Sequence, residues 1–219
     1  MPSFARPAVL ILAALSLAAC GSVHPGDAAV VDGHAISMQV ADESSEAYCA
    51  LAVLTAAQQG VTDVPSADSR RQAVRTLVTL AVARDLADEL GLAPKESDYT
   101  LPRSDRDQIA SALKDADDDE LEHVYTALQD NQELTLIAAS LGAHATGQTL
   151  SEQNRESLTS AGLTEIDKAF ADHDVDIDPR FDLKLPLATD AKPGTGSLSA
   201  TAVKAAADDA DVPVALRCS

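Results

Sequence analysis

The sequence predicts a mainly α-helical protein that forms one domain. Alanine, the residue with the highest helix propensity, is the most frequent residue, whereas glycine and proline number only ten each among 219 residues. A second observation is a repeat in which apolar residues recur every four positions, as on one face of a helix. The residues of this repeat are Val74, Val78, Val82, Leu86 and Leu90. An apolar content of 46% is sufficient for one core and argues against disorder over the whole length.

The N-terminus has the features of a bacterial lipoprotein signal peptide. Arg6 precedes an uncharged apolar run over residues 8–18, which is too short to span a bilayer permanently as a helix. The run ends in the lipobox LAACG, in which the thiol of Cys20 receives a diacylglycerol. We therefore predict a signal peptide over residues 1–19, then a lipidated Cys20 and a polar tether over residues 20–27. The alternative is an ordinary signal peptide in which Cys20 is incidental.

Lipidation predicts that the protein lies at the extracytoplasmic face of the cell membrane. Acyl chains contribute about 0.8 kcal/mol per buried methylene, so a multiply acylated Cys20 would anchor the chain stably. No second apolar stretch is long enough for a transmembrane helix, so the lipid is the expected membrane contact.

Two cysteines, Cys49 and Cys218, remain once Cys20 is lipidated. Exported domains fold in compartments where disulfides persist, so we expect a bridge between these two residues. The bridge would hold the C-terminal end against the first long helix. The alternative is that the two thiols are unrelated.

The first elements of the domain are a short strand at residues 28–31 and a tight turn at residues 32–33. Ser37 is placed to cap a helix that runs to about Gln59 and ends at Gly60.

The next predicted helix carries the four-residue repeat, begins at Asp68 and ends at Gly91. A loop over residues 92–103 follows. Ser104 is then expected to cap a short helix that carries Ile109.

A longer helix is predicted from near Asp118 to Gly142, with a bend around residues 130–131. Thr149, with Glu152 three residues later, has the form of a capping box for one more helix.

A second strand is predicted just before the helical body ends at residue 181, and a tail is predicted after it. Residues 175–178 alternate apolar and acidic side chains, and we expect them to form a strand beside residues 29–31. The fold is thus mainly α over residues 28–181, with a minimal two-strand β element formed by the N-terminal and post-helix segments. Residues 182–219 lack a clear period and predict a surface-lying C-terminal tail.

Charge and composition restrict the partners. The net charge of −19 argues against nucleic acid or an anionic bilayer surface as the main partner. The chain has no Trp and only three Tyr and three Phe, so it also lacks the aromatic platforms on which single-stranded bases stack.

The common signatures of catalysis, cofactor binding and metal binding are absent from the sequence, so we predict a protein that is not an enzyme. The alternating carboxylates of residues 172–178 suit a hard cation, but Ile177 and Leu183 occupy positions where a calcium loop needs Gly and Glu. A strand with one acidic face in water explains these carboxylates better than a calcium loop does. The acidic run over residues 115–122 is typical of a helix start, where carboxylates oppose the helix dipole.

One family does resemble this chain. The lipobox is followed by Ala28-Ala29-Val30-Val31-Asp32-Gly33, then Ile36-Ser37 and a helix, as in the N-terminal domain of SurA-like and trigger-factor-like periplasmic chaperones. The chain looks most like small bacterial lipoproteins that keep this domain alone. Residues 175–181 resemble the returning strand of the domain, and residues 216–218 resemble its terminal segment, which carries the partner of Cys49. Asp182 departs from the family pattern, which has Gly after the Phe.

The resemblance implies a function. SurA-like chaperones bind unfolded chains with this helical domain and carry an inserted parvulin isomerase, for which residues 95–150 are too short and too helical. The family therefore implies a lipid-anchored chaperone-like protein that binds unfolded or exported polypeptides on an apolar helical cradle, without isomerase activity or cofactor. One alternative is a structural or assembly lipoprotein that docks a specific envelope partner. Another is an enzyme or small-ligand binder whose site forms only in three dimensions.

Overall fold

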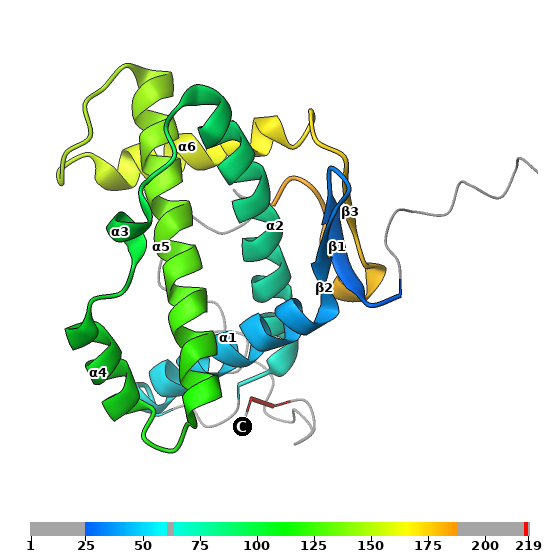
Figure 1. Ribbon diagram of the computed structural model, residues 1–219, viewed down its shortest axis with the longest axis vertical. Coiled ribbons are helices and arrows are strands. Elements are labelled where there is room, and N and C mark those ends of the chain that lie inside the picture. Colours follow the sequence, from blue (N-terminus) through cyan, green and yellow to red (C-terminus); the bar gives the residue numbers. More distant parts are fainter. Residues whose placement is uncertain (1–24, 61–63, 188–216, 219) are drawn as a thin grey trace, which may run out of the picture.

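A β-hairpin opens the domain in the computed structural model, which describes residues 25–60, 64–187 and 217–218 (Figure 1). Strand β1 (Asp27–Val31) pairs antiparallel with β2 (His34–Ser37). The turn between them needs positive φ at Asp32 (49°) and Gly33 (80°), which Gly adopts freely and Asp tolerates. The predicted strand and turn are confirmed.

Two long helices follow the hairpin. Helix α1 (Met38–Gln58) is capped as predicted, since the Ser37 side chain accepts a hydrogen bond from the Val40 amide at 3.2 Å. Helix α2 (Ser66–Leu90) begins two residues before the expected Asp68 and ends, as predicted, at Gly91, whose φ of 68° is left-handed. The backbone amide of Met38 also donates to the Gly26 carbonyl at 2.7 Å, which joins the start of α1 to the start of the domain.

The predicted loop after α2 contains a further helical turn, α3 (Glu96–Tyr99). Helix α4 (Arg103–Ala112) comes next. Its N-cap is Pro102, so the expectation that Ser104 caps this helix is wrong. The Ser104 hydroxyl lies inside the first turn and bonds to the Asp105 carboxylate instead.

Helix α5 (Asp118–Thr146) passes through Gly142, where the sequence predicts its end, and stops at Gly147 with a φ of 67°. Gly142 has a different purpose, because it lets α6 (Arg155–Ala169) approach closely. A Cβ at Gly142 would lie 1.9 Å from the Leu158 carbonyl oxygen.

The capping box predicted for the last helix does not form. Helix α6 begins at Arg155, and Glu152 pairs with that arginine rather than with a cap at Thr149. The side chain of Asn154 accepts from Ser151 and donates to the Thr149 carbonyl, so it closes the preceding turn before the helix can start.

The small sheet has the order β2-β1-β3. Strand β3 (Val175–Ile177) pairs antiparallel with β1, with Ala29 opposite Ile177, as predicted. The hairpin strand β2 adds a third strand to the expected pair. The fold is therefore mainly α with a minimal β element. A 3₁₀ turn, η1 (Pro179–Phe181), follows β3.

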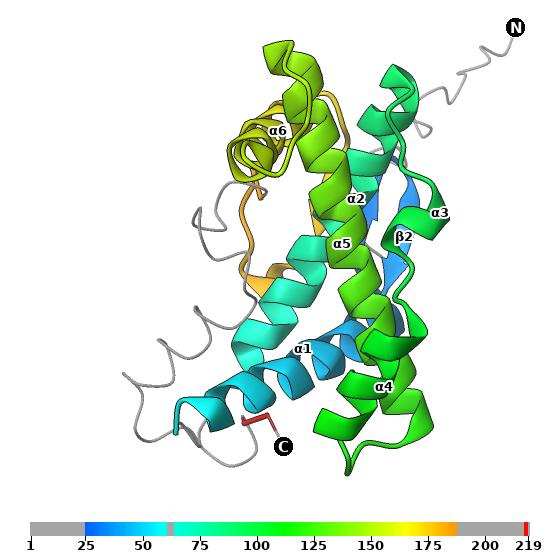
Figure 2. The same cartoon turned by 90° about the vertical axis from the view of Figure 1, so that its left-hand side faces the viewer.

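Helix α2 occupies the centre of the molecule, between the sheet and α5 (Figure 1). Helix α1 crosses the lower parts of α2 and α5, and α6 packs across the upper part of α5 (Figure 2). The main core gathers apolar side chains from the sheet, α2, α5 and α6. Its largest fully buried members are Val74, Val78, Leu80, Val82, Ile137, Leu141, Ile166 and Leu187.

The first residues of the predicted surface tail lie partly on the surface, since residue 182 and residues 184–186 are exposed, and partly in this core. Leu187 is fully buried and Leu183 packs against the same cluster, because apolar leucines at this spacing gain free energy by leaving water. Residues 188–216 and 219, which make up most of the predicted tail, lie outside the described residues.

Candidate functional site

The structure describes two of the three cysteines for which the sequence predicts a role. Cys49 on α1 and Cys218 are joined by a disulfide, with Cα atoms 5.2 Å apart. Beside it, the Cys218 amide donates to the Val64 carbonyl at 2.7 Å, and Arg217 forms a β-bridge with Pro65. The penultimate residue is thus held between α1 and the start of α2.

The predicted lipid attachment at Cys20, the signal peptide and most of the tether lie outside the described residues. Among the helices that the structure describes, none is long and apolar enough to cross a membrane.

The acidic segment after α6 contributes one residue to a small cluster. His173 Nδ1 lies 2.5 Å from an oxygen of Asp32, and the other Asp32 oxygen accepts from the Asp174 amide at 2.8 Å. These bonds lower the pKa of Asp32, the one to His173 having the largest effect. Asp85 of α2 brings a third donor atom, and those of Asp32, Asp85 and His173 lie within 4.8 Å of one another. They could hold a cation, but the hydrogen bonds of Asp32 to His173 and Asp174 already link the hairpin turn to the α6–β3 connection.

The other acidic run has the structural role that the sequence predicts. Asp117 accepts from the Glu120 amide at 2.9 Å and Glu120 accepts from the Asp117 amide at 3.1 Å, which forms a capping box at the start of α5.

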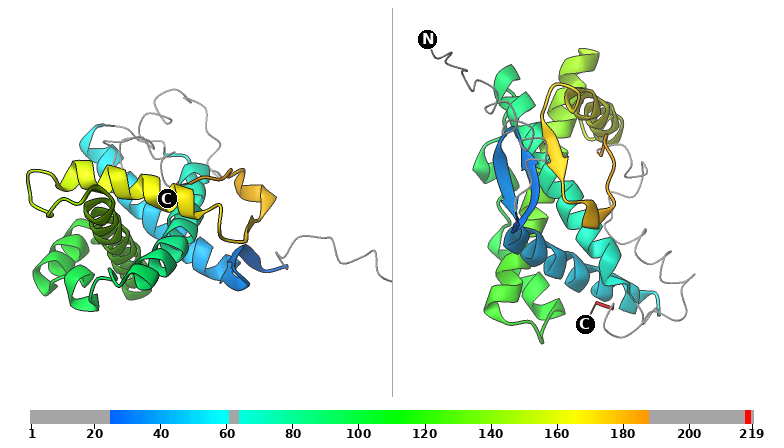
Figure 3. Two further views of the ribbon diagram at one scale, coloured as in Figure 1. Left: turned by 90° about the horizontal axis from the view of Figure 1, so that it is seen from above. Right: turned by 90° about the vertical axis from the view of Figure 1, so that its right-hand side faces the viewer.

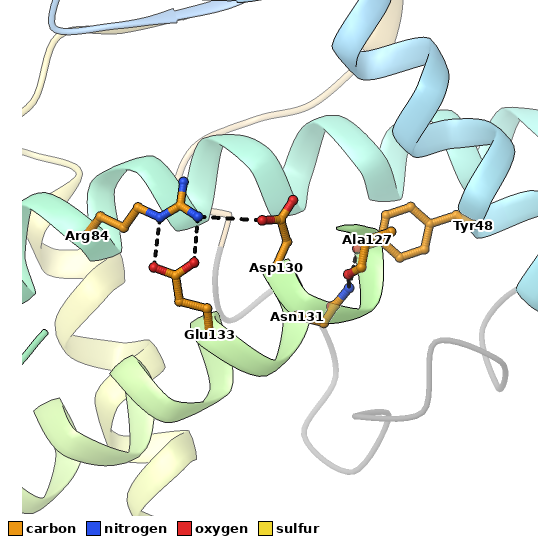
Figure 4. Close-up of polar contacts among 6 residues, drawn as sticks. All are labelled: Tyr48, Arg84, Ala127, Asp130, Asn131 and Glu133. Atoms are coloured by element: carbon orange, nitrogen blue, oxygen red, sulfur yellow. Dashed lines mark hydrogen bonds and ion pairs between the residues drawn. The ribbon is translucent and has the colours of Figure 1, made fainter. Parts of the chain in front are cut away.

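Two sets of polar contacts join the three long helices. Arg84 on α2 donates to both oxygens of Glu133 on α5 and lies 3.5 Å from Asp130, as Figure 4 shows. Glu133 is 6% exposed, so this two-bond contact satisfies a carboxylate that has lost its water. The pKa of Asp130 is raised, because burial outweighs its attraction to Arg84.

A second set of polar contacts joins α1 to α2 and α5. The buried Tyr48 hydroxyl donates to Thr76 at 3.0 Å. It accepts from the Asn131 amide, which also bonds to the Ala127 carbonyl (Figure 4). Burial raises the pKa of Tyr48 to about 12. Since these groups satisfy one another inside the helix bundle, the contacts fix how α1, α2 and α5 pack.

The candidate functional site is an arginine-lined hollow where three distant segments meet. It holds about 200 Å³ and lies between the first turns of α1 and α2 and the η1 turn. Figure 3 shows η1 beside these helix starts. Met38 and Phe181 supply apolar contact, and Arg70, Arg71 and Arg180 supply positive charge. Asp42 is the acidic residue of the lining.

Neighbouring carboxylates orient two of the three guanidinium groups. Arg180 donates to both oxygens of Asp178 at 2.6 to 3.0 Å, which lowers the pKa of Asp178, and Arg71 bonds to Asp68. Asp68 and Asp178 are not part of the lining. These contacts hold the arginines at the edge of the hollow.

A second hollow of about 240 Å³ lies where the ends of α2, α5 and α6 meet. Leu86, Leu90 and Leu141 provide its apolar surface, with His144 and Lys168 among the polar lining. Both hollows are smaller than the roughly 300–1,000 Å³ of typical small-molecule sites, so each suits a single amino-acid side chain.

The chain has no match among protein-family models, curated proteins or solved structures.

Sequence reasoning missed the arginine-lined hollow. Its arginines come from α2 and from the segment after β3, more than a hundred positions apart, and no local spacing joins them. The nearest sequence feature is the Pro179-Arg180-Phe181 stretch, which lies in the segment that resembles the returning strand of SurA-like chaperones.

Proposed function

We propose that the protein is a lipid-anchored, extracytoplasmic, chaperone-like protein that binds exported polypeptides without enzymatic activity. The observation that carries the proposal is the arginine-lined hollow, which combines apolar and charged contacts in a volume suited to one side chain. An extended polypeptide offers such side chains one after another. A flexible Met38 at the hollow accommodates side chains of different shapes.

The middle of the chain supports binding without prolyl isomerisation. Residues 95–150 contain α3, α4 and α5, and α5 packs against α1, α2 and α6 within the helical body. In our proposal this stretch is therefore part of the helical body and not a separate catalytic unit.

The described surface lacks the wide apolar cradle expected from the resemblance. Its exposed large apolar side chains are scattered over α1, the end of α2 and the segment after η1. They are Val40, Val53, Leu90 and Leu185. Contact through discrete hollows therefore fits better than adsorption on a continuous apolar surface.

The same scarcity of exposed apolar surface favours a second candidate function, in which the protein docks one specific envelope partner as an assembly lipoprotein. The number of different polypeptides that bind separates the two proposals. A chaperone suppresses aggregation of several unrelated exported proteins, whereas an assembly lipoprotein crosslinks saturably to one.

The test uses the full lipidated protein in lipid nanodiscs with several unfolded exported proteins. We expect near-stoichiometric suppression of aggregation, which Ala67→Glu should weaken because its side chain fills the arginine-lined hollow. Ala112→Glu, at an exposed position of α4, is the matched control and should retain full activity. Absence of suppression for every client would overturn the chaperone proposal. Equal activity of the two variants would exclude this hollow as the binding site.

The membrane anchor needs its own test. Cys20→Ser should release the protein from the membrane fraction, because the described helices offer no alternative membrane span. An unchanged membrane fraction would contradict lipidation at this residue.

A further inference from the structure

We propose that the arginine-lined hollow binds the free C-terminal carboxylate of a polypeptide that ends in an apolar residue. This inference rests on the proposed function and specifies the segment that is bound. Three guanidinium groups line the hollow. Arg71 and Arg180 are held by carboxylates outside the lining, which leaves Arg70 opposite Asp42, the one carboxylate in the lining. The hollow also lies at the start of α2, where the helix dipole adds partial positive charge.

Asp42 occupies the position that an incoming carboxylate would take. An oxygen of Asp42 lies 3.5 Å from Arg70 Nη2, longer than the roughly 2.7–2.9 Å of a charge-assisted hydrogen bond. The Asp42 and Arg70 side chains are 47% and 61% exposed, so water screens their attraction. Asp42 also helps to raise the pKa of Arg180, although Asp178 has the larger effect. Arg70 is therefore the guanidinium most readily transferred to a new partner.

The size of the hollow favours a chain terminus over an acidic residue within a chain. A terminal residue carries its carboxylate and its side chain on the same Cα atom, so both fit a space of about 200 Å³. The side chain can contact Met38 and Phe181 while the carboxylate meets Arg70. An internal Asp or Glu would need room for the chain to leave in both directions.

The charge of the whole protein restricts the rest of the bound segment. With a net charge of −19, the protein repels strongly acidic polypeptides over about one Debye length, roughly 8 Å at physiological salt. The favoured partner is a neutral or basic segment whose one nearby negative charge is the terminal carboxylate.

The test compares two fluorescent peptides of the same neutral-to-basic sequence ending in Phe, one with a free carboxylate and one with a terminal amide. Binding to the full lipidated protein in nanodiscs is measured by fluorescence anisotropy. We expect the amide to bind about tenfold more weakly, the effect of losing one charge-assisted hydrogen bond at a partly exposed site. Equal affinities would overturn this inference and leave polypeptide binding itself standing. Failure of both peptides to bind, together with no suppression of aggregation, would overturn the proposed function as well.

Variants of the lining give a second, independent measurement. Asp42→Asn should tighten binding of the free-acid peptide roughly threefold or more and leave the amide unchanged, because Arg70 loses its internal competitor. Arg70→Gln should abolish the preference for the free acid. Arg103→Gln, at a side chain 94% exposed on α4, is the matched control and should keep that preference. Weaker binding of the free acid to Asp42→Asn would contradict the inference even if Arg70→Gln proved unstable.

Discussion

Arg84 on α2 holds Glu133 on α5 through two hydrogen bonds, from Nε at 2.9 Å and from Nη2 at 2.5 Å. Glu133 is almost completely buried, whereas Arg84 keeps about half of its side chain in water. The contact therefore compensates a buried carboxylate at the boundary between two helices.

This relationship predicts opposite effects for two acidic residues of the same network. Glu133→Gln should lower the free energy of unfolding by about 2 kcal/mol, because Arg84 loses its buried charged partner. Asp130→Asn should leave stability unchanged or raise it at pH 7, since burial raises the pKa of Asp130 and disfavours its charged form in the fold. Urea unfolding at pH 7 checks both values. Equal destabilisation by the two substitutions would show that the charge of Asp130 stabilises the fold as much as that of Glu133, and would contradict this prediction.

The close contact between α5 and α6 predicts that a side chain added at Gly162 would clash with the neighbouring helix. A Cβ at Gly162 would lie 1.7 Å from the Ala138 carbonyl oxygen, so Gly162→Ala should destabilise the protein by about 3 kcal/mol. Gly147→Ala is the control, because it adds a methyl group in open space and strains only the positive φ of the helix end, at a cost of about 1 kcal/mol. Thermal unfolding distinguishes them. A smaller loss for Gly162→Ala than for Gly147→Ala would show that the helices are not in such close contact.

The Asp32–His173 contact predicts a dependence of stability on pH. The pKa of Asp32 is lower in the fold than its ordinary value of 3.8, so its contribution is present above pH 3.8 and is lost as pH falls through the folded value. Asp32→Asn should therefore cost about 0.5 kcal/mol at pH 6, with allowance for solvent screening, and less at pH 2. Asn tolerates the left-handed backbone at this position, so the change isolates the charge.

Urea unfolding of the wild type and Asp32→Asn at the two pH values measures this difference. Asp88→Asn, at an exposed position of α2, serves as the control and should match the wild type at both. A cost of Asp32→Asn that stays constant between pH 6 and pH 2 would exclude the charge as its cause.

The disulfide predicts a large effect of reduction. It joins residues separated by 169 positions, for which the chain-entropy model gives up to about 5 kcal/mol of stabilisation. Intact mass after alkylation should show no free thiol on Cys49 or Cys218 until a reductant is added, and the reductant should lower the melting temperature. The Cys49→Ser/Cys218→Ser double variant should melt at the lower temperature with or without reductant. Thiols that react without reductant would refute the bridge.

Local signals in the sequence were sufficient for α1 and α2. Ser37 and Gly91 mark helix ends because a side-chain cap and a left-handed glycine act within one turn. Gly142 misled the prediction for a physical reason, since its neighbour Leu158 lies on a different helix and no local pattern shows that contact.

The candidate site depends still more on long-range structure. Arg180 reaches the hollow only because β3 returns to pair with β1, which brings η1 beside the start of α2. The pairing of residues 29–31 with 175–177 was predictable from the alternation of apolar and acidic side chains. The set of side chains that line the hollow beyond this pair was not predictable.

The backbone hydrogen bond from Met38 to Gly26 places the hollow close to the point where the chain enters the domain. Gly26 lies six positions after Cys20, and a fully extended chain of that length reaches roughly 20 Å. If Cys20 carries the lipid, as we propose, the hollow is confined to a thin layer above the bilayer. Polypeptides that emerge from the membrane would then meet the hollow at a high effective concentration, so that even modest affinity for each segment would be sufficient for capture.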